Sequence, residues 1–583
     1  MATQGFVLKR VLGALALCAL TLTASAAAAP PTTTAAGGAA GVATSPRPSF
    51  ETPRLTKHNA IAKLLAVPKV TRWLDRYPPN PRTDAEFDGI SRHWTVHVWS
   101  GRAGEIVRGT VEDLTGRVLE AWTGPQVAWT MARGYPAAFA GRAFSDWWVW
   151  GLSSVLFFVG LVDPRRLLSV RTLDLLALLS FTVSLVFFDR GEIFWSVPLA
   201  YPPLVYLLGR TVWIGVTGRR HVSRATIFWP TAVLIAASVF LLGFRAGVNV
   251  QGRGVVIDAG YAGVIGGDRI LRGQSPYGHM PVSEGRPECG SAKSSNRPHV
   301  QTDGRCENGN PFGDTYGPVS YLAYVPAVAA FGWTGRWDSL PAAHATSIAF
   351  DLLVAVGLWL VGLRFGGRQL AAVLVFAWEA FPFTAYAMNS DTNDAIMPAL
   401  LVWGFLFVTS PFARGAAVAL AGWTKFAALA AAPLWLTYPR LGRRATLKAV
   451  VAFAVATLAA FSILLLEPSL GDAIRTFWNR TIRFQATRGS PFSLWDWGQY
   501  HARGLPDLRA VQVVLEVALT IFAVAVAVVP RRERSPLELA ALTAALLLGT
   551  QLVLTHWFYL YLPWMLPFVL LAFFLPRGDA EPV

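Results

Sequence analysis

The residues of this sequence that could do chemistry are ionisable side chains inside or beside long apolar segments. A charge in such a place is costly, so it is usually retained for a function. Asp258, in Val256-Ile-Asp-Ala-Gly-Tyr261, stands at the start of a polar stretch. A carboxylate there could serve as a general base that takes a proton from a nearby hydroxyl group. It could also cap a helix, and the spacing of its neighbours by itself favours the cap.

Two more carboxylates follow in the same region. Asp268 comes ten residues after Asp258, a spacing that does not place both on a single helical face. We expect Asp268 to form a local ion pair with Arg269. Asp314 directly precedes a short apolar helix with Pro318 in its first turn, which is typical of a helix start. The position of Asp314 nevertheless places it at the mouth of the predicted membrane domain.

The segment Met388-Asn-Ser-Asp-Thr-Asn-Asp394 joins two predicted membrane spans. It could be a solvated turn without a further role. Its amide and carboxylate groups could instead bind sugar hydroxyls or a divalent metal, although the Asp-x-x-Asp spacing is too common to establish a metal site. We therefore retain four candidates for substrate binding: Asn389, Asp391, Asn393 and Asp394.

Two further candidates are basic groups in apolar surroundings. Lys425 lies within an apolar tract, so it requires either an anionic partner, such as a lipid phosphate, or a route to water. The alternative is that its side chain extends to the lipid headgroups. His556 opens the last predicted span and could contact a phosphate or a sugar, although a single histidine at a membrane edge is more often structural.

A second group of cations occupies the polar segment 467–507, where arginines alternate with aromatic residues. The planar guanidinium group suits bidentate recognition of phosphate. Attraction to anionic headgroups explains any single arginine equally well. The group consists of Arg475, Arg480, Arg483 and Arg488, of which Arg480 and Arg488 are the candidates for substrate contact.

Membrane-spanning helices must position these residues. The chain has 583 residues, of which 53% are hydrophobic and 15% are charged. Its short arginine-rich connectors follow the positive-inside pattern, so the net charge of +16 does not indicate nucleic-acid binding. Since apolar runs of about 20 residues match a bilayer, we predict a polytopic α-helical membrane protein with about eleven to thirteen spans. The clearest spans lie near 147–163, 172–188, 193–215, 225–243, 341–363, 370–388, 393–409, 446–466, 508–529, 535–554 and 556–575.

Two other segments leave the number of spans open. Residues 317–333 are apolar but short and rich in proline and glycine, which predicts a re-entrant segment or a short span. Residues 412–437 carry basic residues at both ends and predict a helix pair broken near Thr424–Lys425. Such a break is tolerated where the backbone is buried in protein or lines a cavity.

The basic connectors place two polar loops, 245–316 and 467–507, on the extracytoplasmic side. The first loop contains Cys289 and Cys306. These cysteines could form a disulfide in an oxidising compartment, or they could be two unrelated thiols.

The chain divides into five parts. Residues 1–29 are expected to be a signal peptide or a first transmembrane helix, and residues 30–48 a disordered linker by composition. Residues 50–143 form a small extracytoplasmic domain. Accessory transmembrane helices follow over 147–215, and the main membrane domain covers 225–575.

The small domain is predicted to be α+β. Residues 55–77 indicate a helix, residues 94–99 alternate as a strand does, and residues 105–111 and 117–122 indicate a hairpin with a glycine-containing turn. The domain resembles the PepSY type of small extracytoplasmic domain, and its sequence shows no catalytic constellation. Its protein partner, if it has one, is unknown.

Four stretches of the main membrane domain resemble glycosyltransferase family 87, and the chain looks like an actinobacterial member of it. That family includes polyprenyl-phosphate-mannose-dependent α-mannosyltransferases of the GT-C fold. The chain departs from the family in its N-terminal domain, its additional spans and an insertion around the two loop cysteines, which together leave the acceptor open. The stretches are Ile257-Asp-Ala-Gly-Tyr261 through Tyr277-Gly, Asp314-Thr-Tyr-Gly-Pro318, Trp423-Thr-Lys425 with Pro433, and His556-Trp-Phe-Tyr-Leu-Tyr-Leu-Pro563.

The resemblance implies roles for individual residues. Asp258 matches the family's catalytic base, and Lys425 and His556 match basic residues of the family. Thr315–Pro318 matches a Thr-Tyr-Pro-Pro stretch, with Gly317 in place of the first proline. Three tyrosines also fall in the matched stretches as candidates for substrate contact: Tyr261, Tyr277 and Tyr316.

The function implied is the transfer of a sugar, mannose or another hexose or pentose, from a polyprenyl-phosphate donor to a cell-envelope glycan or glycolipid. The anomeric carbon would be inverted on the extracytoplasmic side of the cell membrane, with Asp258 as base. The sequence contains no GxGxxG, Walker, HExxH or paired CxxC motif. The lipid-linked donor is therefore the expected partner, and a divalent metal stays an alternative.

Two other functions are open. A lipid or glycan transporter or flippase would show paired inverted repeats with broken helices, whereas this sequence has one broken tract and asymmetric outer loops. A scaffold or sensor that used the small domain to bind a partner would leave Lys425 and His556 without a role.

Overall fold

The computed structural model describes residues 52–135, 138–218, 228–253, 255–282, 298–300, 306–337, 340–529 and 532–576. All of the elements below belong to one compact unit, Pro53–Val583. The predictions for residues 1–29 and 30–48 lie outside the described residues, as does the proposed disulfide, because Cys289 is not described.

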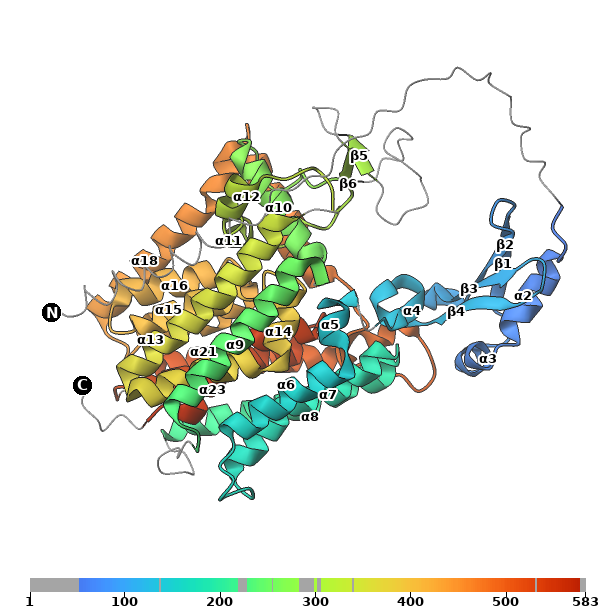
Figure 1. The fold of residues 1–583 in the computed structure, drawn as a ribbon. Helices are drawn as coiled ribbons and strands as arrows, with labels where there is room; N and C mark the ends of the chain where they lie inside the picture. The colour runs from blue at the N-terminus through green and yellow to red at the C-terminus, as the bar shows by residue number, and fades with distance from the viewer. Residues whose placement is uncertain are drawn as a thin grey trace, which may run out of the picture. The chain divides into compact units, whose positions relative to one another are not determined.

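The unit begins with a small module of two helices and an antiparallel sheet (Figure 1). The sheet confirms the predicted strand and hairpin and adds a first strand, which the sequence did not reveal because only Ala85 and Phe87 are apolar in it. The predicted first helix is divided at Pro68. The elements are α2 (Lys57–Leu65), α3 (Pro68–Leu74), β1 (Arg82–Asp88), β2 (His93–Trp99), β3 (Glu105–Glu112) and β4 (Val118–Thr123), with the strands in the order β1-β2-β3-β4.

One face of the sheet carries the core of this module. Along β2, Trp94, Val96 and Val98 are buried, as the alternation of a strand requires. Helix α2 covers this face so closely that a Cβ at Gly109 would lie 2.3 Å from a methyl group of Leu64.

Asp113 ties the start of the module to the β3–β4 turn. Its buried carboxylate accepts hydrogen bonds from the backbone N–H groups of Arg54, at 3.0 Å, and Leu55, at 2.9 Å. The indole N–H of Trp94 donates a third at 3.1 Å, and Arg92 adds an ion pair at 2.8 Å. Burial opposes ionisation, but these hydrogen bonds outweigh it and hold the pKa of Asp113 at about 2.

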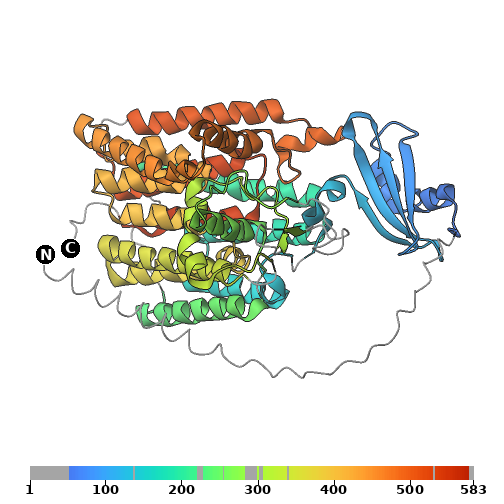
Figure 2. The same ribbon diagram turned by 90° about the horizontal axis from the view of Figure 1, so that it is seen from above.

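The membrane domain is built of helices that run side by side (Figure 2). Six helices of the described chain are long and apolar enough to cross a bilayer, namely Val170–Asp189, Thr231–Gln251, Pro341–Ala380, Arg443–Leu466, Arg509–Val528 and Pro536–Val553. These six support a membrane protein, while the larger number of about eleven to thirteen spans stays a prediction. The longer helices are α6 (Trp147–Leu161), α7 (Val170–Asp189), α8 (Ile193–Thr217), α9 (Thr231–Val248), α13 (Pro341–Ala380), α18 (Arg443–Phe461), α21 (Arg509–Val528), α22 (Pro536–Val553) and α23 (Leu562–Phe574).

Shorter elements lie between the long helices. They comprise α4 (Pro125–Ala128), η2 (Thr130–Arg133), α5 (Gly141–Ser145), η4 (Asn249–Arg253), α10 (Asp258–Leu271), α11 (Pro318–Leu322), α12 (Val325–Phe331), α14 (Pro382–Asn389), α15 (Ile396–Leu406), α16 (Pro411–Gly422), η6 (Phe426–Ala431), α17 (Ala432–Thr437), η7 (Ser462–Leu466), α19 (Leu470–Trp478), η8 (Asn479–Arg483), α20 (Phe484–Thr487), η9 (Leu494–Tyr500) and η10 (Tyr559–Tyr561). In the first large polar loop, β5 (Pro298–Val300) pairs with β6 (Cys306–Asn308) in an antiparallel ladder.

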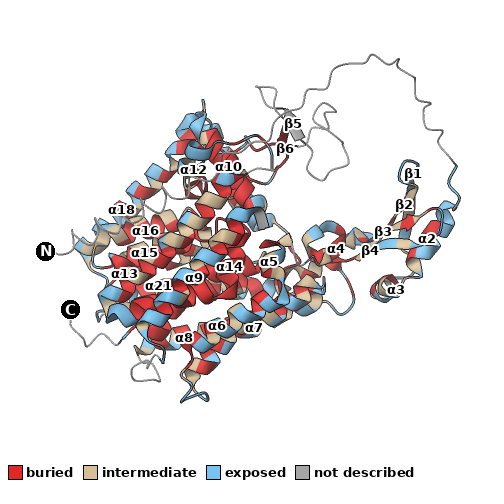
Figure 3. Ribbon diagram, in the orientation of Figure 1, coloured by how far each residue is buried: buried red, intermediate tan, exposed pale blue. Residues whose placement is uncertain are grey.

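The helices differ in how far they are buried (Figure 3). Every residue of α23 is buried, and it forms part of the centre of the domain. In contrast, α9, α18 and α21 expose large apolar side chains such as Phe240, Leu458 and Ile521. Exposed apolar surface of this extent suits contact with lipid.

The predicted breaks in the helices are present. Within α13 the helix is interrupted at Gly367, whose φ is +78°. A Cβ at Gly362 would lie 2.3 Å from Ala371 Cα, so the two halves fold back on each other, as the separate predicted spans require. The tract 412–437 is also broken, since α16 ends at Gly422 and Lys425 is extended before η6.

Residues 317–333 form two short helices, α11 and α12, of five and seven residues. The two helices follow each other directly and together form an apolar stretch, Pro318–Phe331, that is shorter than the six long helices. The choice between a re-entrant segment and a short span stays a prediction.

A buried group of charges joins α9 to α13. The guanidinium of Arg245 forms ion pairs with Asp351 and, at 2.9 Å, with Glu379, and all three side chains are 1% exposed. Charges at membrane depth are stable when they are paired in this way inside the protein. The group lies in the helical core and holds these two helices together.

The N-terminal module is held against the start of α8 and the η9 segment of the membrane domain. The hydroxyl of Tyr77 donates a hydrogen bond to the carbonyl of Tyr500 at 2.9 Å. The ring of Trp73 stacks on Phe194, at the start of α8, with centroids 5.4 Å apart. The module is therefore packed into the unit through buried aromatic residues.

We predict that Asp113→Asn destabilises the module by about 2 kcal/mol, because hydrogen bonds to a charged acceptor each contribute roughly 1.5–3 kcal/mol. Since the folded pKa is depressed, this contribution is complete above about pH 4 and is lost as the pH falls toward 2. Limited proteolysis of the full-length protein at neutral pH should cleave the variant faster within the module. Asp75→Asn, an exposed carboxylate after α3, is the control, and equal cleavage of Asp113→Asn and wild type would contradict the prediction.

Candidate functional site

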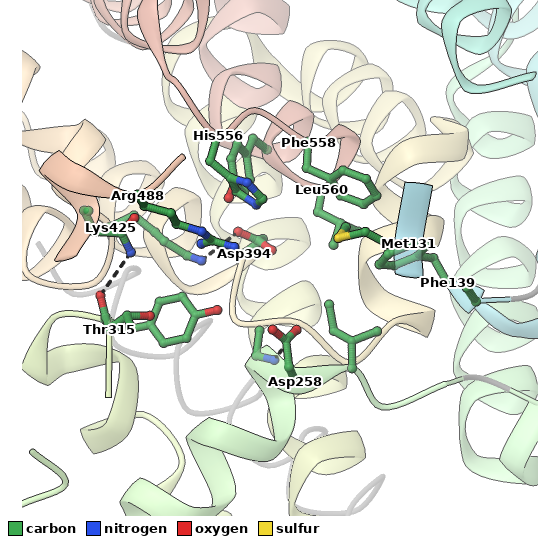
Figure 4. A pocket seen from close by; sticks show the side chains of 16 residues that line it. Met131, Phe139, Asp258, Thr315, Asp394, Lys425, Arg488, His556, Phe558 and Leu560 are labelled. Carbon is green, nitrogen blue, oxygen red and sulfur yellow. Dashed lines mark hydrogen bonds and ion pairs between the residues drawn. The ribbon is translucent and has the colours of Figure 1, made fainter. Parts of the chain in front are cut away.

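A pocket of about 250 Å³ lies among the ends of the membrane-domain helices and the segment that follows the sheet (Figure 4). Six of the residues that line it are among those singled out in the sequence, although up to 298 residues separate them along the chain. They are Asp258, Tyr316, Asp394, Lys425, Arg488 and His556.

Asp258 is the first residue of α10, and the preceding residue, Ile257, is extended. The carboxylate accepts a hydrogen bond from the backbone N–H of Ala259 at 2.9 Å. It does not occupy the N-cap position that its spacing favoured, because that position belongs to Ile257. No cation lies within ion-pair distance of Asp258 among the described residues, so the carboxylate faces the pocket without a fixed partner.

A glycine sets the position of Asp258. A Cβ at Gly260 would lie 2.1 Å from the carbonyl oxygen of Asp391. Only glycine therefore allows the first turn of α10 to pack directly on the polar turn after α14. The backbone N–H of Ile257 also donates to Ser390 O at 3.2 Å, which fixes the start of the helix.

The environment of Asp258 tunes its acidity. The side chain is exposed toward the pocket, yet protein surrounds the pocket. Burial in these surroundings raises the pKa of Asp258, and the positive charges of Arg488 and Lys425 offset part of the rise. A carboxylate with a raised pKa is a stronger proton acceptor, which is the property that a general base needs.

The anionic partner of Lys425 is a carboxylate of the protein itself. Its ammonium lies 3.1 Å from Asp394 Oδ1, and the indole N–H of Trp564 donates to the same oxygen at 2.9 Å. The ammonium also lies over the ring of Tyr316, 4.5 Å from its centroid. The lysine is extended at the break between α16 and η6, so the irregular backbone delivers its side chain to the pocket.

His556 is held in one orientation. Its Nδ1 lies 2.9 Å from Ser490 Oγ, which accepts a hydrogen bond from Phe492 N at 3.2 Å. Which of these two atoms donates depends on the tautomer of the imidazole. In either tautomer the contact with Ser490 fixes the orientation of the ring.

Arg488 is a cation of the pocket that has no ion-pair partner among the described residues. Its guanidinium lies 5.4 Å from the ring of Trp129 and 5.8 Å from that of Phe484. Among the described residues no carboxylate comes within ion-pair distance of it. Because Asp394 already neutralises Lys425, Arg488 is the cation best able to receive an anion.

The other carboxylates and the second arginine from the sequence lie outside the pocket lining. Asp314 is buried and pairs with Arg480 at 2.7 Å, so the two join the loop before α11 to η8. Asp268 pairs with Arg272 at 3.0 Å and with Arg269 at 3.4 Å. The local ion pair predicted for Asp268 and Arg269 is therefore confirmed.

Two of the tyrosines also lie outside the lining. Tyr261 is buried and stacks on Trp337 with ring centroids 4.5 Å apart. The hydroxyl of Tyr277 donates to the carbonyl of Tyr316 at 2.9 Å. Tyr277 therefore supports the backbone of a residue that does line the pocket.

The polar turn after α14 is divided between the pocket and the protein interior. Asp391 accepts a hydrogen bond from Asn249 at 2.8 Å and pairs with His344 at 2.8 Å. Asn389 and Asn393 are buried, and only Asp394 of this turn reaches the pocket. Asp391 and Asp394 thus belong to separate networks, and the described residues contain no group of three or more His, Cys, Asp or Glu side chains arranged for a metal.

The sequence did not indicate the apolar wall of the pocket. Met131, Phe139 and Phe558 line it. The first two belong to the segment between β4 and α6, which showed no catalytic constellation. Apolar residues of this kind are common throughout the chain, so no local signal distinguishes them.

Comparison with family models, curated proteins and solved structures finds no match for this chain. The geometry of the pocket therefore carries the functional argument. The pocket combines a proton acceptor, a cation without an ion-pair partner among the described residues, and an imidazole, which together can bind an anion beside a hydroxyl group that loses its proton.

We predict that Lys425→Met lowers the thermal stability of the purified protein, because removing one partner of a buried pair costs about 3–5 kcal/mol. The double variant Asp394→Asn/Lys425→Met should recover most of the loss. Lys448→Met, an exposed lysine of α18, is the control. If the single and double variants unfold at the same temperature, the pair is not what stabilises this part of the pocket.

Proposed function

We propose that the protein is a membrane glycosyltransferase of GT-C type that transfers a sugar from a polyprenyl-phosphate donor to a cell-envelope glycan or glycolipid. The observation that supports this most directly is the arrangement of Asp258 across the pocket from Arg488 and His556 (Figure 4). Displacement of a phosphate by a hydroxyl group requires a proton acceptor on one side and anion-binding groups on the other.

The reaction follows from this arrangement. The acceptor hydroxyl oxygen attacks the anomeric carbon while its proton passes to Asp258. The bond between the anomeric carbon and the phosphate oxygen breaks, and the lipid phosphate leaves with the electron pair. Arg488 and the imidazole of His556 stabilise the charge on the leaving phosphate. Attack opposite the leaving group inverts the anomeric carbon in a single step.

Arg488 is the cation of the pocket that can contact a donor phosphate directly. Lys425 and Asp394 pair at 3.1 Å, whereas Arg488 has no ion-pair partner among the described residues. With Asp258 ionised, the four charged side chains of the pocket sum to zero, so Arg488 contributes by direct contact with the phosphate and not by an excess of positive charge. The exposed apolar faces of α9, α18 and α21 allow a lipid-linked donor to reach the protein from the bilayer, and a lipid carrier is what a reaction on the extracytoplasmic side of the cell membrane requires.

A transporter or flippase of lipid-linked sugar remains the second candidate, because the same anion-binding groups would serve it. It would not require Asp258 to accept a proton. The two candidates therefore differ in whether a glycosidic bond forms, and a product assay separates them.

We predict that Asp258→Asn lowers sugar transfer by at least about 100-fold, since a general base contributes roughly 10²–10⁴-fold. The amide is isosteric but cannot accept the proton. The measurement is incorporation of label from radiolabelled polyprenyl-phosphate-mannose and other polyprenyl-phosphate sugars into extracted envelope acceptors.

Asp472→Asn, an exposed carboxylate of α19, is the matched control and should keep wild-type transfer. Full activity of a folded Asp258→Asn variant contradicts the assignment of the base. If the wild-type protein moves labelled lipid between leaflets of a vesicle without forming any glycoside, the transporter is the correct function.

The pH dependence provides a further prediction. Transfer should fall as the pH drops through the pKa of Asp258, which burial raises above the ordinary value of 3.8. Arg488 lowers this pKa, so Arg488→Gln should move the acid limb of kcat/KM to higher pH while also reducing the rate. Initial rates across the acid range for both proteins test this, and an acid limb that stays in place or moves to lower pH would contradict it.

A further inference from the structure

The segment that joins the sheet to the membrane domain forms part of the pocket. Strand β4 ends at Thr123, and α6 begins at Trp147. Between them, Met131, Ala138 and Phe139 line the pocket. The N-terminal module therefore ends inside the candidate active site.

Trp129 of this segment contacts both groups that face the leaving phosphate. Its ring stacks on the imidazole of His556 with centroids 5.8 Å apart and an angle of 29° between the planes. The guanidinium carbon of Arg488 lies 5.4 Å from the same ring. Phe492 packs edge-on against Trp129 at 5.5 Å, which limits how the indole can turn.

Hydrogen bonds hold the turn that carries Trp129 in place. The backbone N–H of Trp129 donates to Pro125 O at 3.0 Å, closing the turn of α4. Buried Gln126 donates to Gly191 O, in the α7–α8 connection, at 3.0 Å, and accepts a hydrogen bond from Lys69 of the module. Arg133 Nε donates to Gln126 O at 3.0 Å. The indole is therefore fixed to the module and to the membrane domain at the same time.

An aromatic ring in this position can orient a cation without neutralising it. A carboxylate beside Arg488 would hold the guanidinium equally well, but it would compete with the phosphate for the same charge. The face of an indole attracts a guanidinium through its quadrupole, by about 0.5–2 kcal/mol, and leaves the positive charge available. The same ring shields one face of the imidazole from water.

We propose that Trp129 is a positioning residue, by which the N-terminal module holds Arg488 and His556 in the geometry that receives the donor phosphate. This inference rests on the proposed function for the identity of the ligand. The contacts of Trp129 with the two side chains are independent of that function.

The first test compares three substitutions in the full-length protein. Trp129→Phe keeps an aromatic face and should retain transfer within about threefold. Trp129→Leu keeps an apolar side chain but loses the aromatic face, and Trp129→Ala loses both. These two should lower kcat/KM for the lipid-phosphate sugar by about tenfold or more, the equivalent of losing a cation–π contact and a ring stack. Trp147→Ala, a tryptophan that is 84% exposed, is the control and should be unchanged.

A double-mutant cycle separates positioning from general stability. If Trp129 acts through Arg488 and His556, Trp129→Leu should cause little further loss in an Arg488→Ala/His556→Ala background. Losses that add fully in the combined variant overturn the proposal, because Trp129 would then act independently of these side chains. Wild-type activity of Trp129→Leu also overturns it.

The second test does not depend on transfer. Carbethoxylation by diethyl pyrocarbonate attacks a neutral, accessible imidazole, and peptide mass spectrometry reports the rate at His556. That rate should be at least about threefold faster in Trp129→Leu than in wild type or Trp129→Phe, because an imidazole that no longer stacks on an aromatic ring can turn away from Ser490 and expose a nitrogen lone pair to the reagent. Equal rates in all three proteins overturn the positioning of His556. If wild type catalyses no transfer but the rates differ as expected, the proposed function fails while the positioning role stands.

Discussion

The ion pair between Lys425 and Asp394 is the interaction on which the pocket depends. It brings together three elements that the chain places far apart: the break after α16, the turn after α14, and α23 through the hydrogen bond from Trp564. A lysine in such a buried position is stable only with a partner. Once the pair is formed, its charges cancel, and the character of the pocket is set by Asp258 and Arg488.

The two other charged side chains of the pocket, Asp258 and Arg488, have no ion-pair partner among the described residues. Among the residues that the structure describes, Asp258 accepts a backbone hydrogen bond from Ala259 and pairs with no side chain, and Arg488 lies against the rings of Trp129 and Phe484. By contrast, Asp314 forms an ion pair with Arg480, and Arg245 forms ion pairs with Asp351 and Glu379 in the helical core. The paired charges connect parts of the fold outside the pocket, whereas Asp258 and Arg488 are available to contact a substrate. This difference distinguishes the candidate site from the other polar clusters of the described chain.

The N-terminal module contributes to the pocket as well as to the exposed surface. Its last segment supplies Met131 and Phe139 to the wall, and aromatic contacts such as Trp73 with Phe194 hold it in place. These side chains limit the access of water to the pocket. Electrostatic interactions in the pocket become stronger when water is excluded. The candidate residues of the sequence divide accordingly: Asp258, Lys425 and His556 line the pocket, while Tyr277 and Asp314 support its loops.

The sequence alone determined the features that depend on local pattern. Apolar runs indicated the membrane helices, alternation indicated β2 and the β3–β4 hairpin, and the basic residue inside an apolar tract marked the break at Lys425. The sequence did not indicate strand β1, because only Ala85 and Phe87 of its residues are apolar. The tertiary structure decided which charges meet. Lys425 pairs with Asp394, Arg480 with Asp314 across 166 residues, and Trp129 comes to lie against His556. Such partnerships depend on how distant helices pack, and no spacing along the chain records that packing.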